Sequence, residues 1–465
     1  MRPRLSPDRA FAISFAFART AFCAYRAATQ SFTSDEAFSY NEFISGDWSR
    51  LYDSFSANNH LLYSILAKLS IGAFGASEFA LRLPSVLSGF FFVLGVYYLL
   101  REAGCSRAVT WMAMIGLSLH PLLLDFSVAA RGYGLSMALF VWAIYFLLRG
   151  RDIFAGALAG LAISANLTLL YPAVGLILCP LLLRKDGFEN RIQGFLRLTF
   201  TLLAVFGAVY YESLSQATLT NFYVGTTTIR DSVLNLIVSS IFDRVWRGIF
   251  GSFDAAHMIE FAALPAIMLF ACVKSLPYPR NIKLAPLTIL LVALTELIAA
   301  HYILGLRYPI DRLGLYLIVL FALAWAVALS STGNPWIRGV NGAIAGLIVL
   351  QFATQLQARW FQVWEYDDAT KQMALRIENE TRDKPPDSVK IGATWWQQPA
   401  LEFYRKVYRI AALQPVKRYE TTPLEGFDYY VLDLRSDPTI RNRNVKRLRP
   451  LLSEPAADVL LAKEP

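Results

Sequence analysis

Two adjacent carboxylates, Asp35 and Glu36, lie in the segment FTSDEAFSYNEF, directly after the first apolar run of the chain. The residues that follow are also acidic, because they include Glu42 and Asp47. One carboxylate in such a place can act as a general base toward a hydroxyl or an amine, and its neighbour can bind a metal or hold the geometry. The alternative is structural, since Ser34-Asp35-Glu36 can also open a helix. The two interpretations are compatible.

Arginines suited to phosphate occur in two later segments. Arg131 lies in LHPLLLDFSVAARGYGL, and Arg307 and Arg312 lie in RYPIDRLGLYL. A guanidinium offers a planar fork of donors that matches phosphate oxygens. The alternatives are an interfacial arginine or an ion pair with Asp125 for Arg131, and a surface pair of Asp311 with Arg312.

A histidine and several aromatic residues are further candidates for substrate contacts. His60 in NNHLLYS could contact substrate, a metal or a phosphate, or could satisfy a loop backbone. Tyr133 and the pair Trp395-Trp396 could stack on sugar rings. Aromatic residues at a membrane interface or in a core are the commoner explanation.

The elements that must position these residues are membrane helices. The 465 residues are 55% hydrophobic and only 17% charged, whereas soluble domains average about 25% charged residues. The net charge of +9 follows from basic loops between apolar runs, so we expect no nucleic-acid partner. The sequence contains no GxxxxGK[ST] or GxGxxG signature. The four cysteines and four histidines show neither a disulfide framework nor metal-ligand spacing.

Apolar runs predict about eleven transmembrane helices, several of them short. They are 10–28, 81–100, 109–124, 133–148, 153–167, 168–183, 195–211, 258–273, 284–303, 313–329 and 339–355. The first run is atypical because Arg19 would lie at mid-depth, which costs a few kcal/mol unless it faces protein or water.

Lys and Arg counts in the short connections set the orientation. With the N-terminus inside, the basic connections are 2–9, 101–107, 149–152, 184–197, 274–283 and 331–338. This topology places all the candidate residues named above on the outer side, together with the C-terminus. Ionisable residues in or beside a membrane are candidates for function.

Two outer connections are long. Residues 29–80 contain LLYSILAKLSIGAF over 61–74, which predicts an interfacial helix, and residues 231–250 within the connection 212–257 predict a second amphipathic helix. Residues 1–357 are thus expected to form the membrane domain. Residues 358–465 alternate strand-like and helix-like runs and predict a small extracytoplasmic α/β domain.

The order of these segments resembles the glycosyltransferase C (GT-C) superfamily over roughly residues 1–330. The segments are the Asp35-Glu36 pair after the first helix, NNHLLYSILAKLSIGAFGASEFALRLPSVLSG, the Arg131 segment and RYPIDRLGLYL. The resemblance is to bacterial protein-mannosyltransferase, lipid A aminoarabinose transferase and rhizobial core-sugar transferase types. One departure is Ala129, where relatives often carry an acid two positions before the arginine. Whether Asp125 takes the place of that missing acid is left open.

The resemblance implies an inverting transferase that takes a sugar from a polyprenyl-phosphate donor at the outer face of the membrane. It places the base at Asp35, with Glu36 beside it, and the family arginine at Arg131, with Tyr133. Arg307 and Arg312 complete the expected phosphate contacts, and His60 and Asp125 the substrate contacts. A divalent metal near Glu36 is left open. The expected partners are the donor, membrane lipid and an acceptor glycan, lipid or protein.

The expectation is therefore an all-α polytopic GT-C-like protein of a bacterial inner membrane, with a small α/β domain in the periplasm or outside the cell. Two other classes compete. A lipid or glycan transporter or flippase would show pseudo-repeats and helices broken near the midplane, and a scaffold that presents the C-terminal domain would tolerate loss of Asp35.

Overall fold

The structure is a computed structural model that describes residues 6–53, 55–213, 216, 224–241, 266–267, 269–274, 281–419, 422, 425–435, 440, 447–455 and 457–464. Its helices are α1 (Pro7–Thr29), α2 (Ser34–Ser39), α3 (Leu61–Phe74), α4 (Glu78–Glu102), α5 (Arg107–Leu119), α6 (Pro121–Asp125), α7 (Gly132–Leu148), α8 (Asp152–Ala165), α9 (Leu170–Leu183), α10 (Phe188–Tyr210), α11 (Ile229–Ile241), α14 (Ala285–Leu304), α15 (Leu315–Ser331), α16 (Pro335–Thr354), α17 (Thr370–Thr381) and α18 (Gln398–Val407). The strands are β1 (Ile391–Ala393), β2 (Tyr429–Asp433), β3 (Arg449–Glu454) and β4 (Val459–Lys463).

The chain divides into two compact units. The first unit comprises Met1–Ala24, Ser54–Tyr63 and Pro84–Leu356, and the second comprises Tyr25–Asp53, Ser64–Leu83 and Gln357–Pro465. The second unit therefore contains most of the predicted first outer loop as well as the C-terminal segment.

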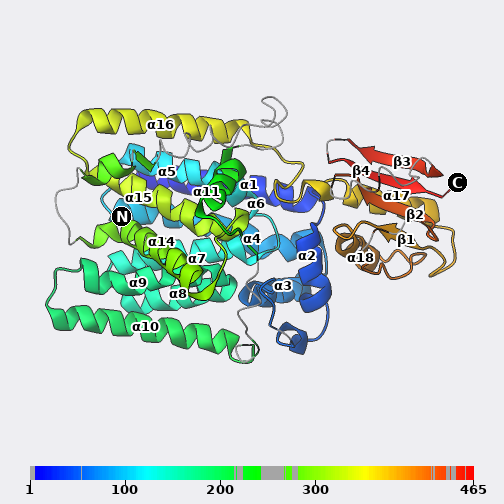
Figure 1. The fold of residues 1–465 in the computed structure, drawn as a ribbon, viewed down its shortest axis with the longest axis horizontal. Helices are drawn as coiled ribbons and strands as arrows, with labels where there is room; N and C mark the ends of the chain where they lie inside the picture. Colours follow the sequence, from blue (N-terminus) through cyan, green and yellow to red (C-terminus); the bar gives the residue numbers. More distant parts are fainter. Residues whose placement is uncertain are drawn as a thin grey trace, which may run out of the picture. The chain divides into compact units, whose positions relative to one another are not determined.

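The first unit is a bundle of apolar helices. In it α8 packs against both α7 and α10, and α14 packs against α9 and α15 (Figure 1). Small residues bring the backbones close: a Cβ on Gly156 of α8 would overlap the Leu198 carbonyl oxygen of α10, and one on Gly160 would lie 2.7 Å from the Leu202 oxygen. Such close approach is how helices associate where no hydrophobic effect drives them together.

By length and composition, five described helices can cross a membrane. They are Glu78–Glu102, Phe188–Tyr210, Ile282–Leu304, Asp311–Ser331 and Pro335–Thr354. Shorter apolar helices cover Leu61–Phe74, Arg107–Leu119, Gly132–Leu148, Asp152–Ala165 and Leu167–Leu183. The protein is thus a mostly helical membrane protein, as predicted, and the count of about eleven spans stays a prediction. Most of the predicted run 258–273, and residues 242–257, lie outside the described residues.

The first predicted span is a helix, α1, and the structure explains its atypical arginine. Arg19 is only 5% exposed. Its Nε donates to the Ser118 carbonyl oxygen (3.0 Å), and its Nη2 donates to the Ser127 hydroxyl (2.7 Å). Arg19 therefore faces protein, and it satisfies polar groups near the end of α5 and just after α6.

One predicted helix is wrong. The run 109–124 was expected to form a single span, but it is broken at His120, whose φ of −55° and ψ of 124° are not helical. Pro121 follows and opens the short helix α6. A proline disfavours helical backbone at the residue before it, so the sequence His120-Pro121 separates α5 from α6.

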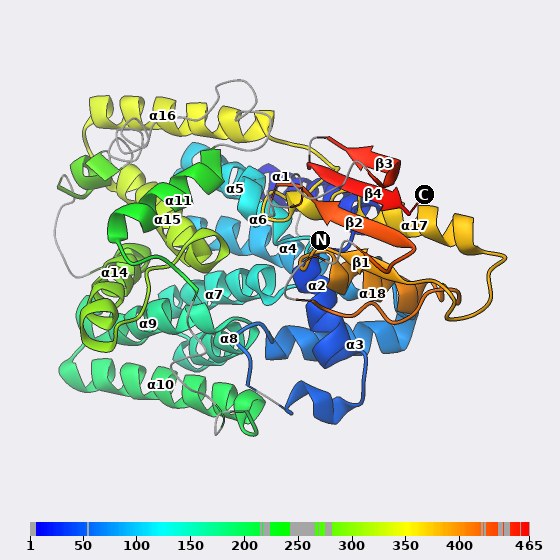
Figure 2. The same ribbon diagram turned by 45° about the vertical axis from the view of Figure 1, so that its right-hand side comes forward.

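The second unit combines a four-stranded sheet with helices from both ends of the chain. The strand order is β1-β2-β4-β3, in which only the β1–β2 pair is parallel. Figure 2 shows this sheet with α17 and α18 beside it. α18 also packs against α2 and against the residues just before it, where Phe403 stacks on Phe32 (ring centroids 4.0 Å apart) and the Phe32 N–H donates to the Tyr404 hydroxyl (2.7 Å).

Candidate active site

Asp35 lies in the first turn of α2, which a capping box starts. Thr33 is the N-cap: its hydroxyl accepts from the Glu36 N–H (3.3 Å), and the Glu36 carboxylate accepts from the Thr33 N–H (2.8 Å). This reciprocal pair satisfies two backbone donors that a helix start leaves open. The structural interpretation of Ser34-Asp35-Glu36 is thus confirmed, since α2 begins at Ser34. Asp35 itself is half-buried.

The Glu36 carboxylate is bound on both oxygens by a buried arginine that the sequence analysis did not single out. Arg82 of α4 donates from Nε to Oε1 (2.8 Å) and from Nη2 to Oε2 (2.7 Å), with both side chains fully buried. The remaining Arg82 donors reach backbone carbonyl oxygens at the end of α1 and just beyond it, those of Ala27 (3.1 Å), Gln30 (2.9 Å) and Ser31 (2.7 Å).

This arrangement gives Glu36 a structural role, as the link between the end of α1, the start of α2 and α4. The Glu36 carboxylate is not suited to bind a divalent ion, because both of its oxygens already accept hydrogen bonds from the Arg82 guanidinium and one also accepts from a backbone N–H. Within the described part of the chain, no group of three or more His, Cys, Asp or Glu side chains could hold a metal.

A second carboxylate, Asp367, lies beside Asp35. Its Oδ2 accepts from the Ser34 N–H (2.7 Å) and its Oδ1 from the Thr370 hydroxyl (3.4 Å). Burial raises the pKa of the Asp367 carboxyl well above its usual range, and the negative charge of Asp35 raises it further, although these hydrogen bonds oppose the shift. Through its hydrogen bond with the Ser34 N–H, Asp367 connects the C-terminal segment to the N-terminus of α2.

The predicted phosphate and substrate residues lie in the first unit, where several come together. Arg131, the N-cap of α7, is 2% exposed and donates to the carbonyl oxygen of Asn58 (3.2 Å) and to its side-chain oxygen. His60 is also buried, with Nδ1 3.1 Å from the Ala165 carbonyl oxygen, and its ring packs edge-on against Tyr133 (4.8 Å).

The positive charges around His60 are close enough to act on it. Burial lowers the pKa of His60 well below its usual range, and the charges of Arg131 and Arg312 lower it further, although the contact with Ala165 opposes the shift. The imidazole is therefore neutral at pH 7. His60 and Tyr133 are in ring contact, and the charges of Arg131 and Arg312 act on His60; we call these four residues the Arg131 cluster.

The other two predicted residues of this unit are placed differently. Arg307 is exposed and donates to the Gly225 carbonyl oxygen (3.4 Å), next to the isolated bridge between Thr226 and Tyr308. Asp125 ends α6 with a buried side chain, and its backbone carbonyl accepts from the Val128 (2.9 Å) and Ala129 (2.8 Å) N–H groups. Asp35 and Glu36, by contrast, belong to the second unit.

Sequence reasoning missed Arg82, Asp367 and Asn58. Arg82 lies in SEFALRLPSVLSG, a segment noted only for its resemblance, and an arginine early in an apolar helix was the available signal. Asp367 lies in the acidic run WEYDDAT just before α17, which resembles an ordinary helix start. Its partner Ser34 is more than 300 residues away, so no local pattern connects them.

The fold is similar to those of solved membrane transferases. The structure of ArnT from Cupriavidus metallidurans bound to undecaprenyl phosphate matches 97% of this chain and 98% of its own, with a TM-score of 0.53 and 14% identity. The oligosaccharyltransferase from Archaeoglobus fulgidus in complex with zinc and sulfate matches 97% of this chain and 73% of its own, with a TM-score of 0.52 and 12% identity. A scan of protein-family models and a search of curated proteins find no match. Both solved proteins are GT-C glycosyltransferases, so the chain has the fold that the resemblance implies.

Proposed function

We propose that this chain is a membrane glycosyltransferase that moves a sugar from a polyprenyl-phosphate donor to an acceptor nucleophile. The observation that carries the proposal is the Arg131 cluster, in which the buried Arg131 is held by hydrogen bonds to Asn58 and the buried His60 packs against Tyr133, within a chain of this fold. Buried guanidinium groups bind phosphate through charge-assisted hydrogen bonds, and the ArnT structure with a similar fold holds undecaprenyl phosphate.

The proposed reaction is a direct displacement. Asp35 accepts a proton from the acceptor hydroxyl or amine as its oxygen or nitrogen attacks the anomeric carbon of the sugar. The bond between that carbon and the phosphate oxygen breaks, and its electron pair leaves with polyprenyl phosphate. Attack from the face opposite the leaving group inverts the anomeric centre.

The positive charges would hold the phosphate as it leaves. Arg131 and Arg312 are assigned this role, and Arg307 is assigned an outer contact with the same anion, because it is exposed. Positive groups aimed at charge that develops in the transition state lower the barrier most when they are fixed beforehand. Arg131 meets this condition through its two hydrogen bonds to Asn58.

The proposed location is a bacterial inner membrane, with the reaction at the outer face and residues 358–465 on the periplasmic or extracellular side. Support comes from the excess of Lys and Arg in alternate connections of the sequence.

The test uses purified protein in detergent with a panel of radiolabelled polyprenyl-phosphate sugars and measures release of polyprenyl phosphate. Wild type should release it, and Asp35→Asn should lose at least about 100-fold in rate, since general-base catalysis contributes roughly 10²–10⁴-fold. Asp53→Asn is the matched control, because Asp53 is an exposed acid of the same segment.

Three outcomes separate the possibilities. Loss in Asp35→Asn with donor binding and thermal unfolding unchanged supports Asp35 as the base. Equal turnover in Asp35→Asn and wild type would overturn that role. Donor binding without turnover in every preparation, with membrane extracts supplied as acceptor, would instead favour a lipid or glycan transporter.

A further inference from the structure

Around Asp35 the second unit carries a continuous series of aromatic and cationic contacts. The Tyr366 and Ser34 hydroxyls are 3.0 Å apart, and the Tyr366 ring lies 6.0 Å from Trp396. Trp396 packs edge-on against Trp395 (4.6 Å). The Arg418 guanidinium lies 3.4 Å from the centre of the Trp395 ring and 5.4 Å from that of Phe38. We call Phe38, Tyr366, Trp395, Trp396 and Arg418 the aromatic rim.

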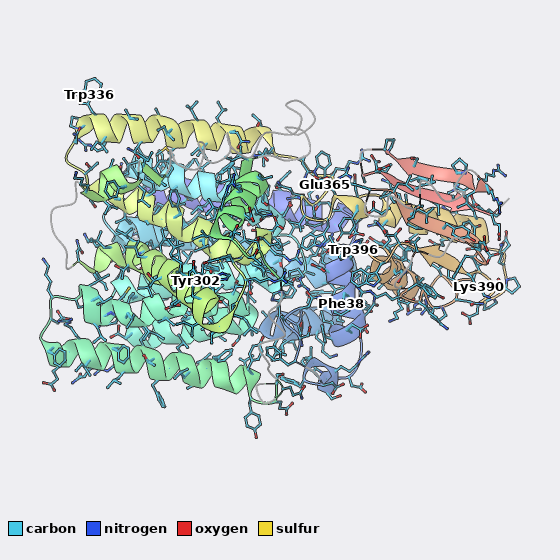
Figure 3. All side chains as sticks on the ribbon, viewed as in Figure 1. Phe38, Tyr302, Trp336, Glu365, Lys390 and Trp396 are labelled. Atoms are coloured by element: carbon cyan, nitrogen blue, oxygen red, sulfur yellow. The ribbon has the colours of Figure 1, made fainter. Side chains whose placement is uncertain are left out.

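The rim begins and ends on the helix that carries Asp35. Ser34 precedes Asp35, and Phe38 follows it by three residues, so Asp35 and Phe38 lie on the same face of α2. These two are also the residues of α2 that are not buried. Figure 3 labels Phe38 on α2 and Trp396 on the segment between β1 and α18.

The base of the rim is buried and hydrogen-bonded, and its rings are half-buried except for that of Trp396, which is exposed. Trp396 is 41% exposed. The residues that flank the tryptophan pair are buried and hydrogen-bonded: Thr394 accepts from the Asp433 N–H (2.9 Å), and Gln398 donates to the Ala393 carbonyl oxygen (2.7 Å) and accepts from the Tyr419 N–H (2.9 Å). An exposed indole on an ordered backbone loses less conformational entropy on binding a ligand than one on a loop that must also become ordered.

The chemistry of the rim suits a sugar ring. Aromatic faces carry partial negative charge, and the C–H bonds on one face of a pyranose carry partial positive charge, so the two stack. The Asp35 carboxylate accepts hydrogen bonds from hydroxyls, and Arg418 donates to hydroxyls or acidic groups. A lipid tail would need an uninterrupted apolar surface, whereas here the rings alternate with Ser34, Asp35 and Arg418.

We propose that the aromatic rim is the acceptor subsite and that the acceptor is a saccharide, either a glycan or the sugar headgroup of a glycolipid. This inference rests on the proposed function, because Asp35 takes its proton from the acceptor and the ring that stacks beside Asp35 is therefore the acceptor ring. Trp396 and Tyr366 contact the face of that ring, and Arg418 contacts its substituents.

The experiment measures transfer from a radiolabelled polyprenyl-phosphate sugar that wild type uses. The acceptor probe is the glycolipid and glycan extract of cells from which this gene has been deleted, where the acceptor accumulates unmodified. Trp396→Ala should raise the extract concentration for half-maximal transfer about tenfold, which corresponds to the upper range of roughly 0.5–1.5 kcal/mol for an aromatic contact. Trp396→Phe should recover part of the loss. The Kd for the donor should stay within about twofold of the wild-type value, so a tenfold change in the acceptor requirement is easily distinguished from a change in donor affinity.

The matched control is Trp336→Ala, because Trp336 of α16 is 81% exposed and belongs to the first unit. It should leave half-maximal transfer unchanged. An unchanged acceptor requirement in Trp396→Ala, a parallel loss of donor affinity, or label recovered in protein rather than in saccharide would each overturn the proposal. If wild type releases no polyprenyl phosphate from any donor, the proposed function fails first, which is a distinct result.

Discussion

At the scale of single residues, two neighbouring carboxylates have opposite environments. Glu36 is fully buried and bound by Arg82, whereas Asp35, in the same helical turn, is half-buried. From the sequence alone, both acids of the Asp35-Glu36 pair were candidates for a direct role in the reaction. The structure separates them into one acid that is fully buried and holds the backbone and one that is half-buried.

We predict that Glu36→Gln destabilises the protein strongly. It would leave the Arg82 guanidinium buried without its counter-charge, and breaking a buried ion pair in this way costs about 3–5 kcal/mol. Thermal or denaturant unfolding of the purified protein in detergent measures this loss. Glu42→Gln is the control, because Glu42 is an exposed acid of the same region, and a loss below about 1 kcal/mol, as typical for exposed pairs, would contradict the prediction.

A second prediction concerns Asp367 and pH. Its folded-state pKa is raised, so as pH rises above about 3.9 the unfolded chain loses this proton before the folded protein does. Folding stability from this group therefore declines with rising pH until the folded-state pKa is passed. Asp367→Asn keeps an oxygen that can accept from Ser34 and removes the titration, so its stability relative to wild type should increase with pH.

Unfolding midpoints at several pH values between 4 and 8 would check this difference. The companion variant Asp367→Ala removes the acceptor as well, and should be less stable than Asp367→Asn at every pH because the Ser34 N–H is then left unsatisfied. A constant difference between Asp367→Asn and wild type across the range would show that Asp367 does not titrate as inferred.

At the scale of elements, the sequence predicts the helices well where apolar runs are long and bounded by turn residues. The segment 61–74 is a helix with the predicted limits, and 133–148 differs from α7 by one residue. The prediction failed at His120-Pro121, where the apolar run continues but the helix is interrupted. It also could not find the partners of Arg19, because the oxygens of Ser118 and Ser127 lie about 100 residues away.

The contact between α8 and α10 gives a prediction at this scale. Gly156→Leu should cost about 1–3 kcal/mol, as overpacking usually does, because a side chain there would overlap the backbone of α10 at Leu198. Gly207→Leu on α10 is the control, since a Cβ on Gly207 meets nothing within 4 Å. Unfolding midpoints in detergent compare the two, and equal shifts would mean that α8 and α10 are not packed this closely.

At the scale of the whole molecule, each compact unit is built from segments that are far apart in the sequence. The sequence predicts a C-terminal domain from residue 358, because composition changes there. In the structure the same segment forms one unit with residues 25–53 and 64–83, and contacts such as Phe32 with Phe403 and Ser34 with Asp367 are part of that unit. Composition reports where polarity changes, and it carries no information on which distant segments pack together.

We therefore predict that residues 357–465 do not fold alone. Without residues 25–53, the buried side chains of Phe403 and Tyr404 would be exposed to water, and fully burying an aromatic side chain is worth roughly 1.5–3 kcal/mol. Dispersed amide resonances and a cooperative unfolding transition from the isolated segment would contradict this. Co-expression of residues 1–356 with 357–465 should recover protease resistance of the C-terminal segment.

The contacts of Arg82 with residues 27–36 also have a consequence for the order in which the protein folds during synthesis. Residues 27–36 leave the ribosome early, but their backbone oxygens and the Glu36 carboxylate must wait for Arg82, and the Ser34 N–H must wait for Asp367. The proposed base is thus among the first residues made and among the last to be placed. A nascent chain inserting into the membrane would be inert toward donor lipid until nearly all of it had been translated.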